Sequence, residues 1–451
     1  MNISRKKFIK NSALTVGGLM IIPRHVLGRG FTPPSDKLNI AGIGVGGKGE
    51  SDIRNAYYDG KSNVVALCDI DSMRAKNSIE RFPKANFYSD FRQMLEKEKN
   101  NIDAVTISTP DHTHAVIAMA AMELGKHVYV QKPLTHNIFE ARTLTESARK
   151  NKGRIGTVHT VNVWTNRPVW PQGIPVPTAK FETPAHINWD LWLGPASKVD
   201  YSPAYHPFKW RGWWNFGTGA LGDMGCHLIA PPYRVLDLGY PTEVECSVGA
   251  VFLRDWTPEN LPDGCPPSSS VQLKFPKSKK NNSEVTFNWT DGGIRPFHPD
   301  LIPSDTMMGD DDGSNGVIMI GTKGIMTCGT YGINPKLYFK NEVIKMEDVK
   351  PVINLPENGH QAKWVNACKA GFNSPQHKAL TSSFDFAGPL TEAILMGNLA
   401  IRSYGLRNEH LDGKGFDYIG RKKLLWDGTN MKITNLEEAN TFVKREYRIG
   451  W

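Results

Sequence analysis

The chain has 451 residues, of which 40% are hydrophobic, and this is enough to form two or three domains. Its formal net charge is +9, but the first 29 residues hold six of the 54 basic residues and no acidic ones. The remaining 48 basic and 45 acidic residues nearly balance, and no nucleic-acid-binding motif accompanies them, which argues against a nucleic-acid partner. The six cysteines show neither a CxxC pair nor a zinc-ligand spacing, so we expect no metal site.

Residues 1–32 are predicted to form an export signal followed by a linker. A basic cluster in SRKKFIK (residues 4–10) precedes an apolar stretch, residues 13–22, that is too short to span a bilayer. SRKKFIK resembles a twin-arginine signal, which exports folded proteins, except that Lys6 stands in place of the second arginine. We expect a periplasmic protein without a later membrane span, and a cytoplasmic protein is the alternative.

Residues 33–155 alternate strand and helix patterns in the order of a Rossmann domain. A buried strand over residues 37–43 runs into the glycine-rich turn GVGGKG, and a helix follows to about residue 59. A second buried strand covers residues 63–68. This order of strand, glycine-rich turn, helix and strand is the one that binds dinucleotides.

The glycine-rich turn is predicted to hold the cofactor phosphates. Glycines permit the tight turn, let the backbone approach a pyrophosphate and allow the helix to pack against its strand. Asp69 follows the second strand, where a carboxylate accepts hydrogen bonds from a ribose diol and repels a 2′-phosphate. We therefore predict NAD, tightly bound or exchanging, rather than NADP. The cofactor-binding residues predicted here are Gly44, Gly46, Gly47, Lys48, Gly49 and Asp69.

The alternation continues through three more elements, expected at residues 102–108, 114–123 and 127–131. The two strands among them deliver the dipeptides Thr109-Pro110 and Lys132-Pro133. Ligands of doubly wound sheets sit beyond the carboxyl ends of the strands, so both dipeptides should reach the crevice where a nicotinamide would lie.

The run DAVTISTPDHTHAVIAMAAMELGKHVYVQKPLTHNIFEAR (residues 103–142) resembles the Gfo/Idh/MocA oxidoreductases. The hallmark of that family pairs a Thr-Pro…His segment with Gly-Lys-His-Val and Glu-Lys-Pro, and Gln131 departs from the usual glutamate. The resemblance implies a homo-oligomer, dimer or tetramer, and substrates that are sugars, cyclitols or their derivatives. It also implies that the cofactor contacts Thr109, Pro110, His114, Gln131 and Lys132.

Residues 156–451 are predicted to form a substrate-binding and catalytic α+β domain. Longer strand patterns are expected in a large, mainly antiparallel open sheet, at residues 242–254, 270–275, 283–289 and 316–328. A helix is expected at residues 384–405, with apolar residues spaced for packing. The predicted fold class is thus α/β, with a Rossmann domain followed by this α+β domain.

The segment Asp223-Met-Gly-Cys-His227 is the predicted catalytic motif. If a helix has begun by residue 221, Asp223 and His227 lie at i and i+4 on one face. A histidine can take a hydroxyl proton as a hydride leaves. The family resemblance implies that His227 is the general acid/base, that Lys132 hydrogen-bonds the reacting hydroxyl and that Asp223 orients them. In the alternative interpretation, Asp223 caps a helix and His227 is a core residue.

Tryptophans are frequent between residues 164 and 214, where aromatic faces could stack on sugar rings and basic side chains could bind hydroxyls or a carboxylate. The substrate-binding residues predicted from this region are His159, Trp164, His206, Lys209, Arg211 and Trp214.

Three functional hypotheses follow from the sequence. The leading one is an NAD-dependent oxidoreductase acting on a secondary hydroxyl of a sugar, glycoside or cyclitol. The second is an enzyme that retains NAD and works as a glycoside hydrolase, lyase or epimerase through a transient keto-sugar. The third is a non-catalytic carbohydrate-binding protein with a vestigial cofactor fold.

Overall fold

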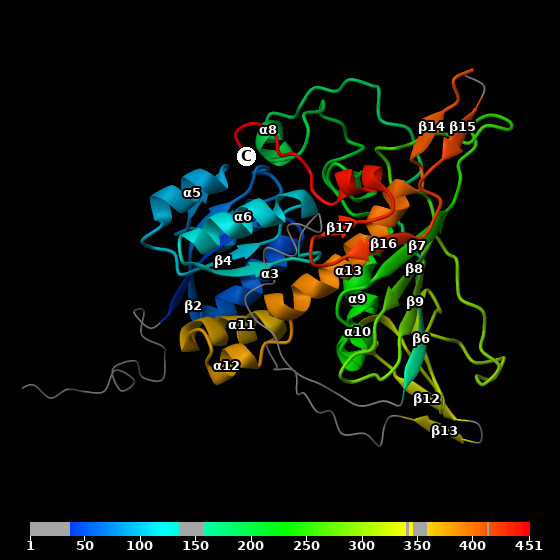
Figure 1. The fold of residues 1–451 in the computed structure, drawn as a ribbon. Coiled ribbons are helices and arrows are strands. Elements are labelled where there is room, and N and C mark those ends of the chain that lie inside the picture. The colour runs from blue at the N-terminus through cyan, green and yellow to red at the C-terminus, as the bar shows by residue number, and fades with distance from the viewer. Residues whose placement is uncertain (1–36, 135–156, 340–341, 346–358, 413–414) are drawn as a thin grey trace, which may run out of the picture.

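The computed structural model describes residues 37–134, 157–339, 342–345, 359–412 and 415–451. The predicted export signal and linker therefore lie outside the described residues, and so does the expected domain junction near residue 155. Within the described part, two separate sheets form the framework of the protein (Figure 1).

The first sheet has five parallel strands in the order β3-β2-β1-β4-β5, as expected for a Rossmann domain. The strand order reverses between β1 and β4, and a ligand crevice is expected at that point. Its strands are β1 (Leu38–Ile43), β2 (Ser62–Cys68), β3 (Asn86–Tyr88), β4 (Ala104–Ile107) and β5 (His127–Val130). The helices of this unit are α3 (Lys48–Tyr57), α4 (Lys76–Arg81), α5 (Phe91–Glu98) and α6 (Asp111–Glu123).

The second sheet has ten strands in the order β13-β12-β11-β10-β6-β9-β8-β7-β16-β17. Only β6 and β9 pair in parallel, so the prediction of a mainly antiparallel sheet is confirmed. The pattern at residues 316–328 is a hairpin instead of one strand, because Ile320 pairs with Ile325 across a turn. The strands are β6 (Val158–Thr165), β7 (Glu243–Val248), β8 (Ser269–Phe275), β9 (Val285–Thr290), β10 (Asn315–Gly321), β11 (Ile325–Cys328), β12 (Lys336–Phe339), β13 (Glu342–Lys345), β16 (Leu424–Asp427) and β17 (Lys432–Ile433).

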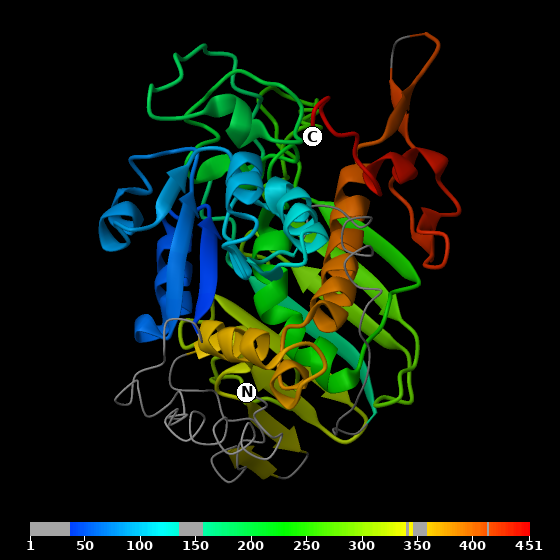
Figure 2. The same cartoon turned by 90° about the vertical axis from the view of Figure 1, so that its left-hand side faces the viewer.

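Three helices lie between the Rossmann unit and the large sheet (Figures 1 and 2). They are α9 (Gly219–Leu228), α10 (Ala230–Leu236) and α13 (Phe384–Ser403). The expected helix at residues 384–405 is thus present as α13, and it is buried along most of its length because it packs on both the sheet and α9. Its Ile394 shares one core with Leu221 of α9 and Phe287 of β9. This core fixes α9 against the sheet.

Helix α11 (Gly359–Ala370) returns from the second half of the chain to the Rossmann unit. Its residues Trp364 and Val365 share a core with Ile40 of β1 and Ile53 of α3. The sequence pattern predicts that all residues after 155 belong to the second domain, whereas α11 packs on the first sheet. The difference arises because α11 covers an apolar flank of the first sheet that residues 33–155 do not cover by themselves.

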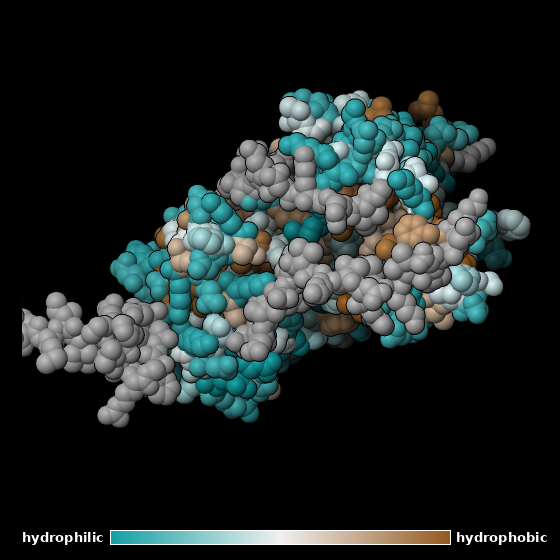
Figure 3. Space-filling view, turned by 90° about the horizontal axis from the view of Figure 1, so that it is seen from below, coloured by the Kyte–Doolittle hydropathy of each residue, from teal (hydrophilic) through white to brown (hydrophobic). Residues whose placement is uncertain are grey.

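The surface seen from below carries mostly hydrophilic residues with scattered hydrophobic ones (Figure 3). Among the described residues, no helix combines the length and apolar character needed to cross a bilayer. The same residues contain no group of three or more His, Cys, Asp or Glu side chains placed to hold a metal ion. All six cysteines are free thiols, and Cys68 is a buried core residue.

Candidate active site

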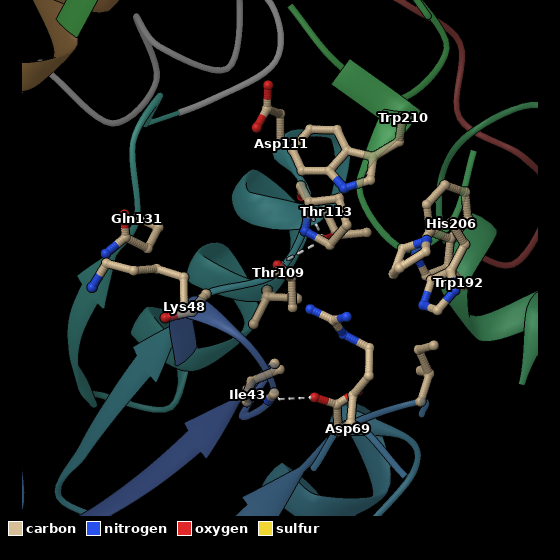
Figure 4. Close-up of a pocket in the computed structure, with 18 of the residues that line it drawn as sticks. Ile43, Lys48, Asp69, Thr109, Asp111, Thr113, Gln131, Trp192, His206 and Trp210 are labelled. Atoms are coloured by element: carbon tan, nitrogen blue, oxygen red, sulfur yellow. Dashed lines mark hydrogen bonds between the residues drawn. The ribbon is translucent and has the colours of Figure 1, made fainter. Parts of the chain in front are cut away.

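A cavity of about 560 Å³ lies at the carboxyl ends of the Rossmann strands and extends to α9. In Figure 4, Lys48 and Gln131 lie at one side, His206 and Trp192 at the other, and Thr109 between them. Residues from both domains line it. Those from the Rossmann unit include Gly44, Gly46, Lys48, Asp69, Arg74, Thr109, Pro110, Gln131 and Lys132, and those from the second domain include Phe208, Trp210, Arg211, Asp223, His227 and Tyr331.

The glycine-rich turn has a shape that only glycine allows. Gly44 has φ 72°, and a Cβ there would lie 2.8 Å from the carbonyl group of Ser108. A Cβ on Gly49 would lie 1.7 Å from the carbonyl oxygen of Gly44. The turn leads directly into α3, and both Gly46 in the turn and Lys48 at the start of the helix line the cavity. This arrangement fits a dinucleotide pyrophosphate, which helix N-termini attract.

Asp69 is placed to receive a ribose. Its Oδ2 accepts a hydrogen bond from the Gly46 amide at 2.9 Å, and its Oδ1 accepts one from the Asp71 amide at 3.0 Å. Burial raises the pKa of Asp69, and these two bonds oppose that rise. Each carboxylate oxygen can accept a second hydrogen bond, so acceptors remain for ribose hydroxyls. The residues present therefore fit NAD.

Arg74 is a cofactor-side residue that sequence reasoning missed. It lines the cavity, and its Nη2 lies 2.5 Å from where a Cβ on Gly47 would stand. A guanidinium near the Asp69 carboxylate can bind a 2′-phosphate by donating hydrogen bonds to it. We therefore expect Asp69 to favour NAD and Arg74 to favour NADP. The signal for Arg74 in the sequence was a basic residue shortly after Asp69.

Replacing Asp69 by alanine should weaken NAD binding by about 10- to 100-fold, because charge-assisted hydrogen bonds to the ribose are lost. The same change should bring NADP affinity closer to NAD affinity, because Arg74 then meets a 2′-phosphate without an opposing carboxylate. Dissociation constants for both cofactors, measured by fluorescence titration, check this. The control is the double variant D69A/R74A, which should again disfavour NADP; an unchanged preference in D69A would contradict the ribose role.

Helix α9 begins at Gly219, so Asp223 and His227 share one face, as predicted. The Lys132 ammonium donates to Asp223 Oδ1 at 2.8 Å and to the Asp223 carbonyl oxygen at 2.9 Å. Arg211 Nε approaches the same Oδ1 at 3.3 Å. Burial acts to raise the pKa of Asp223, but the Lys132 and Arg211 charges bring it below its usual value. Asp223 is therefore a carboxylate held between two cations.

His227 lines the cavity one helical turn beyond Asp223. Burial is the larger cause and the nearby Lys132 charge the second, and together they lower the pKa of His227 to about 4. Its ring meets that of Tyr331 edge to face, with centroids 4.8 Å apart. Because Thr218 is the N-cap of α9, Asp223 is not a cap, and the alternative of a capping aspartate with a core histidine does not hold. A neutral imidazole at this point can accept a proton.

Among the predicted cofactor residues, His114 needs a correction. Its side chain is buried and does not line the cavity. Its ring nitrogens lie 2.8 Å from the carbonyl oxygens of Pro133 and Thr109. His114 therefore ties the two cavity-lining dipeptide segments together from behind, because the first turn of α6 directs it into the protein interior.

Two of the predicted substrate-binding residues, His206 and Arg211, do line the cavity. His206 Nε2 lies 3.6 Å from the Asp71 carboxylate, and burial lowers the pKa of His206 to about 4. The Arg211 guanidinium lies over the ring of Trp210, 4.2 Å from its centroid. This second-domain wall therefore combines aromatic and basic side chains.

The other four predicted substrate-binding residues are corrected by the structure, because none lines the cavity. Trp164 is fully buried, and its indole N–H donates to the Gly313 carbonyl oxygen at 3.0 Å. Trp214 packs into the core of the second domain. His159 and Lys209 are exposed elsewhere. Of the tryptophans expected as a group between residues 164 and 214, Trp192 and Trp210 do line the cavity. Sequence reasoning missed three other aromatic residues that line it, Phe208, Tyr331 and Trp451.

The fold and the cavity are those of a protein with an NAD-binding Rossmann domain. A family model described as "Oxidoreductase family, NAD-binding Rossmann fold" matches residues 38–159, and one described as "Oxidoreductase family, C-terminal alpha/beta domain" matches residues 160–251. The chain therefore belongs to the Gfo/Idh/MocA family, as its sequence motifs predicted.

Curated relatives match a shorter part of the chain. A "Glycosyl hydrolase family 109 protein" of Shewanella pealeana is 26% identical over 185 residues, which is 36% of this chain and 40% of the relative. An "Alpha-N-acetylgalactosaminidase" of Shewanella oneidensis is 25% identical over 186 residues, with the same coverage. The chain thus spans about two fifths of the length of these relatives.

Solved structures share the fold at low sequence identity. The WlbA dehydrogenase of Bordetella pertussis, in complex with NADH and UDP-GlcNAcA, is 15% identical, with a TM-score of 0.50. The similarity covers 82% of this chain and 98% of that one. It supports the two-domain architecture described above.

Proposed function

We propose that this protein oxidises a secondary hydroxyl of a sugar, glycoside or cyclitol, with NAD as the hydride acceptor. The observation that carries the proposal is the meeting of Lys132, Asp223 and His227 in the cavity that also contains the glycine-rich turn. A protein that only bound carbohydrate would need neither the buried neutral histidine nor the cation held beside it.

Each of the three residues has a distinct role in this proposal. His227, neutral at pH 7, takes the proton of the reacting hydroxyl. Lys132 hydrogen-bonds the hydroxyl oxygen and stabilises negative charge that develops on it. Asp223 holds the Lys132 ammonium in place through the 2.8 Å bond. Bound NAD supplies the hydride acceptor, and in a redox-neutral reaction it returns the hydride within the same turnover.

The second-domain wall supports a carbohydrate as substrate. Trp210 and Phe208 offer apolar ring faces, which pack well against the C–H faces of sugars, and the Arg211 guanidinium beside them can bind hydroxyl or carboxylate oxygens. The names of the matching curated relatives also point to glycosides.

A redox-neutral enzyme with retained NAD is the second candidate, and a strap formed by residues 443–451 favours it. The strap crosses from the second domain to the Rossmann unit, and Trp451 at its end lines the cavity. Arg448 attaches the strap to α8 (Trp189–Leu193) and to Gly194, which follows that helix. Its Nη2 donates to the Asp190 carbonyl oxygen at 2.9 Å, and its Nε donates to the Gly194 carbonyl oxygen at 3.1 Å.

On the Rossmann side, Arg92 holds the same strap. Its Nη1 donates to the Gly450 carbonyl oxygen at 3.2 Å, and its guanidinium lies 4.3 Å from the Trp451 ring centroid. Trp451 also contacts Phe91, with ring centroids 6.1 Å apart. Phe91 lines the same cavity as Asp69, the proposed ribose acceptor. A strap fastened to both domains here would slow the release of NAD.

Replacing Arg448 by alanine should speed NAD dissociation by about tenfold, because the strap then loses its attachment to α8 (about 1–2 kcal/mol of hydrogen bonding). Stopped-flow displacement of bound NAD measures the rate. The matched control is Arg407→Ala, which removes an arginine stacked on Phe416, in the small sheet of β14 (Arg407–Glu409) and β15 (Phe416–Tyr418). If R448A released NAD at the wild-type rate, the strap would have no part in retention.

One assay distinguishes the two candidate functions. The purified protein is denatured to look for released NAD, and a panel of sugars and 4-nitrophenyl glycosides, including the N-acetyl-α-galactosaminide, is assayed with and without added NAD. Stoichiometric NADH formation supports the dehydrogenase. Release of nitrophenol without net NADH, in protein that already carries NAD, supports the redox-neutral enzyme. If neither reaction occurred with any member of the panel, both proposals would lose their support.

We also propose that residues 1–32 direct export to the periplasm. A cofactor retained by the strap could cross the membrane inside the folded protein, which the twin-arginine route permits. Cell fractionation of a strain producing the full chain tests this, and removal of residues 1–32 should leave the protein in the cytoplasm.

A further inference from the structure

Asp52 in α3 is a fully buried carboxylate that the proposed chemistry does not use. Four side chains donate hydrogen bonds to it. Its Oδ1 accepts from the Lys48 ammonium and from Gln361 Nε2, the latter at 3.1 Å. Its Oδ2 accepts from the Ser108 hydroxyl at 2.9 Å and from Gln131 Nε2 at 2.8 Å. A carboxylate has about four acceptor sites, so Asp52 is saturated.

The donors come from separate parts of the chain. Lys48 opens α3, Ser108 follows β4, Gln131 follows β5 and Gln361 belongs to α11. Burying an isolated carboxylate is costly, and hydrogen bonds from all four donors offset that cost only while each donor keeps its place. Three of the donors, Lys48, Ser108 and Gln131, line the cavity. Asp52 thus fixes one wall of the cavity without touching its contents.

Gln131 links Asp52 to the proposed catalytic lysine. Its Nε2 donates to Asp52, and its Oε1 accepts from the backbone amide of Lys132 at 3.4 Å. Lys132 then extends to Asp223. The amide side chain of Gln131 can donate at one end and accept at the other, whereas an ionised glutamate has no donor. Lys48 and Gln131 lie side by side in Figure 4.

We propose that Asp52 is a positioning residue that acts through Gln131 to hold Lys132 in line with Asp223, so that residues 52 and 131 form one matched acid–amide pair. The proposal rests on the proposed function of Lys132. It gives a physical reason for glutamine in the Gln-Lys-Pro segment: with a carboxylate already buried at residue 52, a second one at residue 131 would face it at hydrogen-bond distance.

The test exchanges the two members of the pair. The variants are D52N, Q131E and the double variant D52N/Q131E, in which the acid and the amide trade places. At neutral pH, Q131E should lower kcat by about 10- to 100-fold, because two facing carboxylates repel and displace Lys132. Lowering the pH to about 5.5 should restore part of the loss, because such a pair takes up a shared proton. D52N/Q131E should recover to within about threefold of wild type.

A matched control separates positioning from general stability. Glu98 is another buried carboxylate of the Rossmann unit, and it accepts hydrogen bonds from Asn86, Tyr88 and Asn101, away from the cavity. Glu98→Gln should lower Tm about as much as D52N does while leaving kcat unchanged. A double variant no better than its worse parent, or a Q131E protein with wild-type kcat at neutral pH, would overturn the proposal.

A readout without turnover keeps the proposal independent of the substrate. The Lys132 charge helps to depress the pKa of His227, so displacement of Lys132 should raise the titration midpoint of His227. The midpoint is followed by NMR of labelled histidine, with His227 assigned by its substitution. A rise in Q131E that D52N/Q131E reverses supports the matched pair even if no sugar is turned over. A midpoint that is the same in all variants counts against it.

Discussion

Replacing Lys132 by alanine is expected to lower kcat by about 10²- to 10⁴-fold, the range lost when a group that assists proton transfer is removed. The ammonium lies 2.8 Å from Asp223 Oδ1, and Lys132 lines the cavity, so its loss takes away the cation that we propose binds the reacting oxygen. The loss of Lys132 also leaves the Asp223 carboxylate with the hydrogen bond from Arg211, whose Nε lies 3.3 Å from Asp223 Oδ1. Steady-state kinetics on a substrate found in the sugar panel measure the change.

The pH profile of the same variant gives a second expectation. In the wild type, burial and the Lys132 charge hold the pKa of His227 at about 4, so the base is lost only as the pH falls through that value. Without the ammonium, the pKa of His227 should rise, and the acid limb of kcat/KM should move to higher pH. Lys126→Ala, which changes a half-buried lysine before β5 that does not line the cavity, is the control. An unchanged acid limb in K132A would remove the link between the two residues.

Replacing His227 by alanine should cost a similar factor of about 10²- to 10⁴-fold in kcat, because it removes the neutral base proposed to take the hydroxyl proton. NAD affinity should stay close to wild type, since the glycine-rich turn and Asp69 are untouched. Kinetics together with fluorescence titration of NAD separate the two effects. His298→Ala, at an exposed histidine outside the cavity, serves as the control. Full activity in H227A would assign the base elsewhere.

The pKa of His227 also predicts a stability effect with a definite sign. A histidine whose folded-state pKa is depressed binds a proton better when unfolded, so it lowers stability as the pH falls from about 6.5 toward about 4. The H227A protein should therefore lose less Tm over this interval than the wild type. Thermal unfolding at a series of pH values measures the difference, and parallel curves would mean that His227 is not buried in its neutral form.

The sequence predicted the elements whose signals are local. The turn from Gly44 to Gly49, the position of Asp69 after a buried strand and the i, i+4 spacing of Asp223 and His227 each lie within one short segment. In the structure, Gly44, Gly46, Asp69, Asp223 and His227 from these segments all line one cavity. Their geometry follows from backbone sterics and helix periodicity, which do not depend on distant residues.

The remaining parts of the site depend on contacts between distant segments. Asp52 meets Gln131 and Gln361 only after the sheet and α11 have formed. Among the tryptophans, composition could not distinguish Trp164, which fills a core, from Trp210, which faces the cavity. Which side of a loop faces a ligand is set by tertiary packing, and no periodicity marks it in a segment without regular structure.

The packing of α11 on the first sheet has a consequence for the way the molecule can be divided. The chain passes from the Rossmann unit to the large sheet and then returns to the Rossmann unit through α11. It crosses a third time to form α13 in the second domain. A fragment that ends before β6 would lack the cover for Ile40 and Ile53 and would expose an apolar flank to water. The two halves are therefore expected to unfold as one cooperative unit, and the nucleotide-binding half should not be obtainable as a soluble fragment by itself.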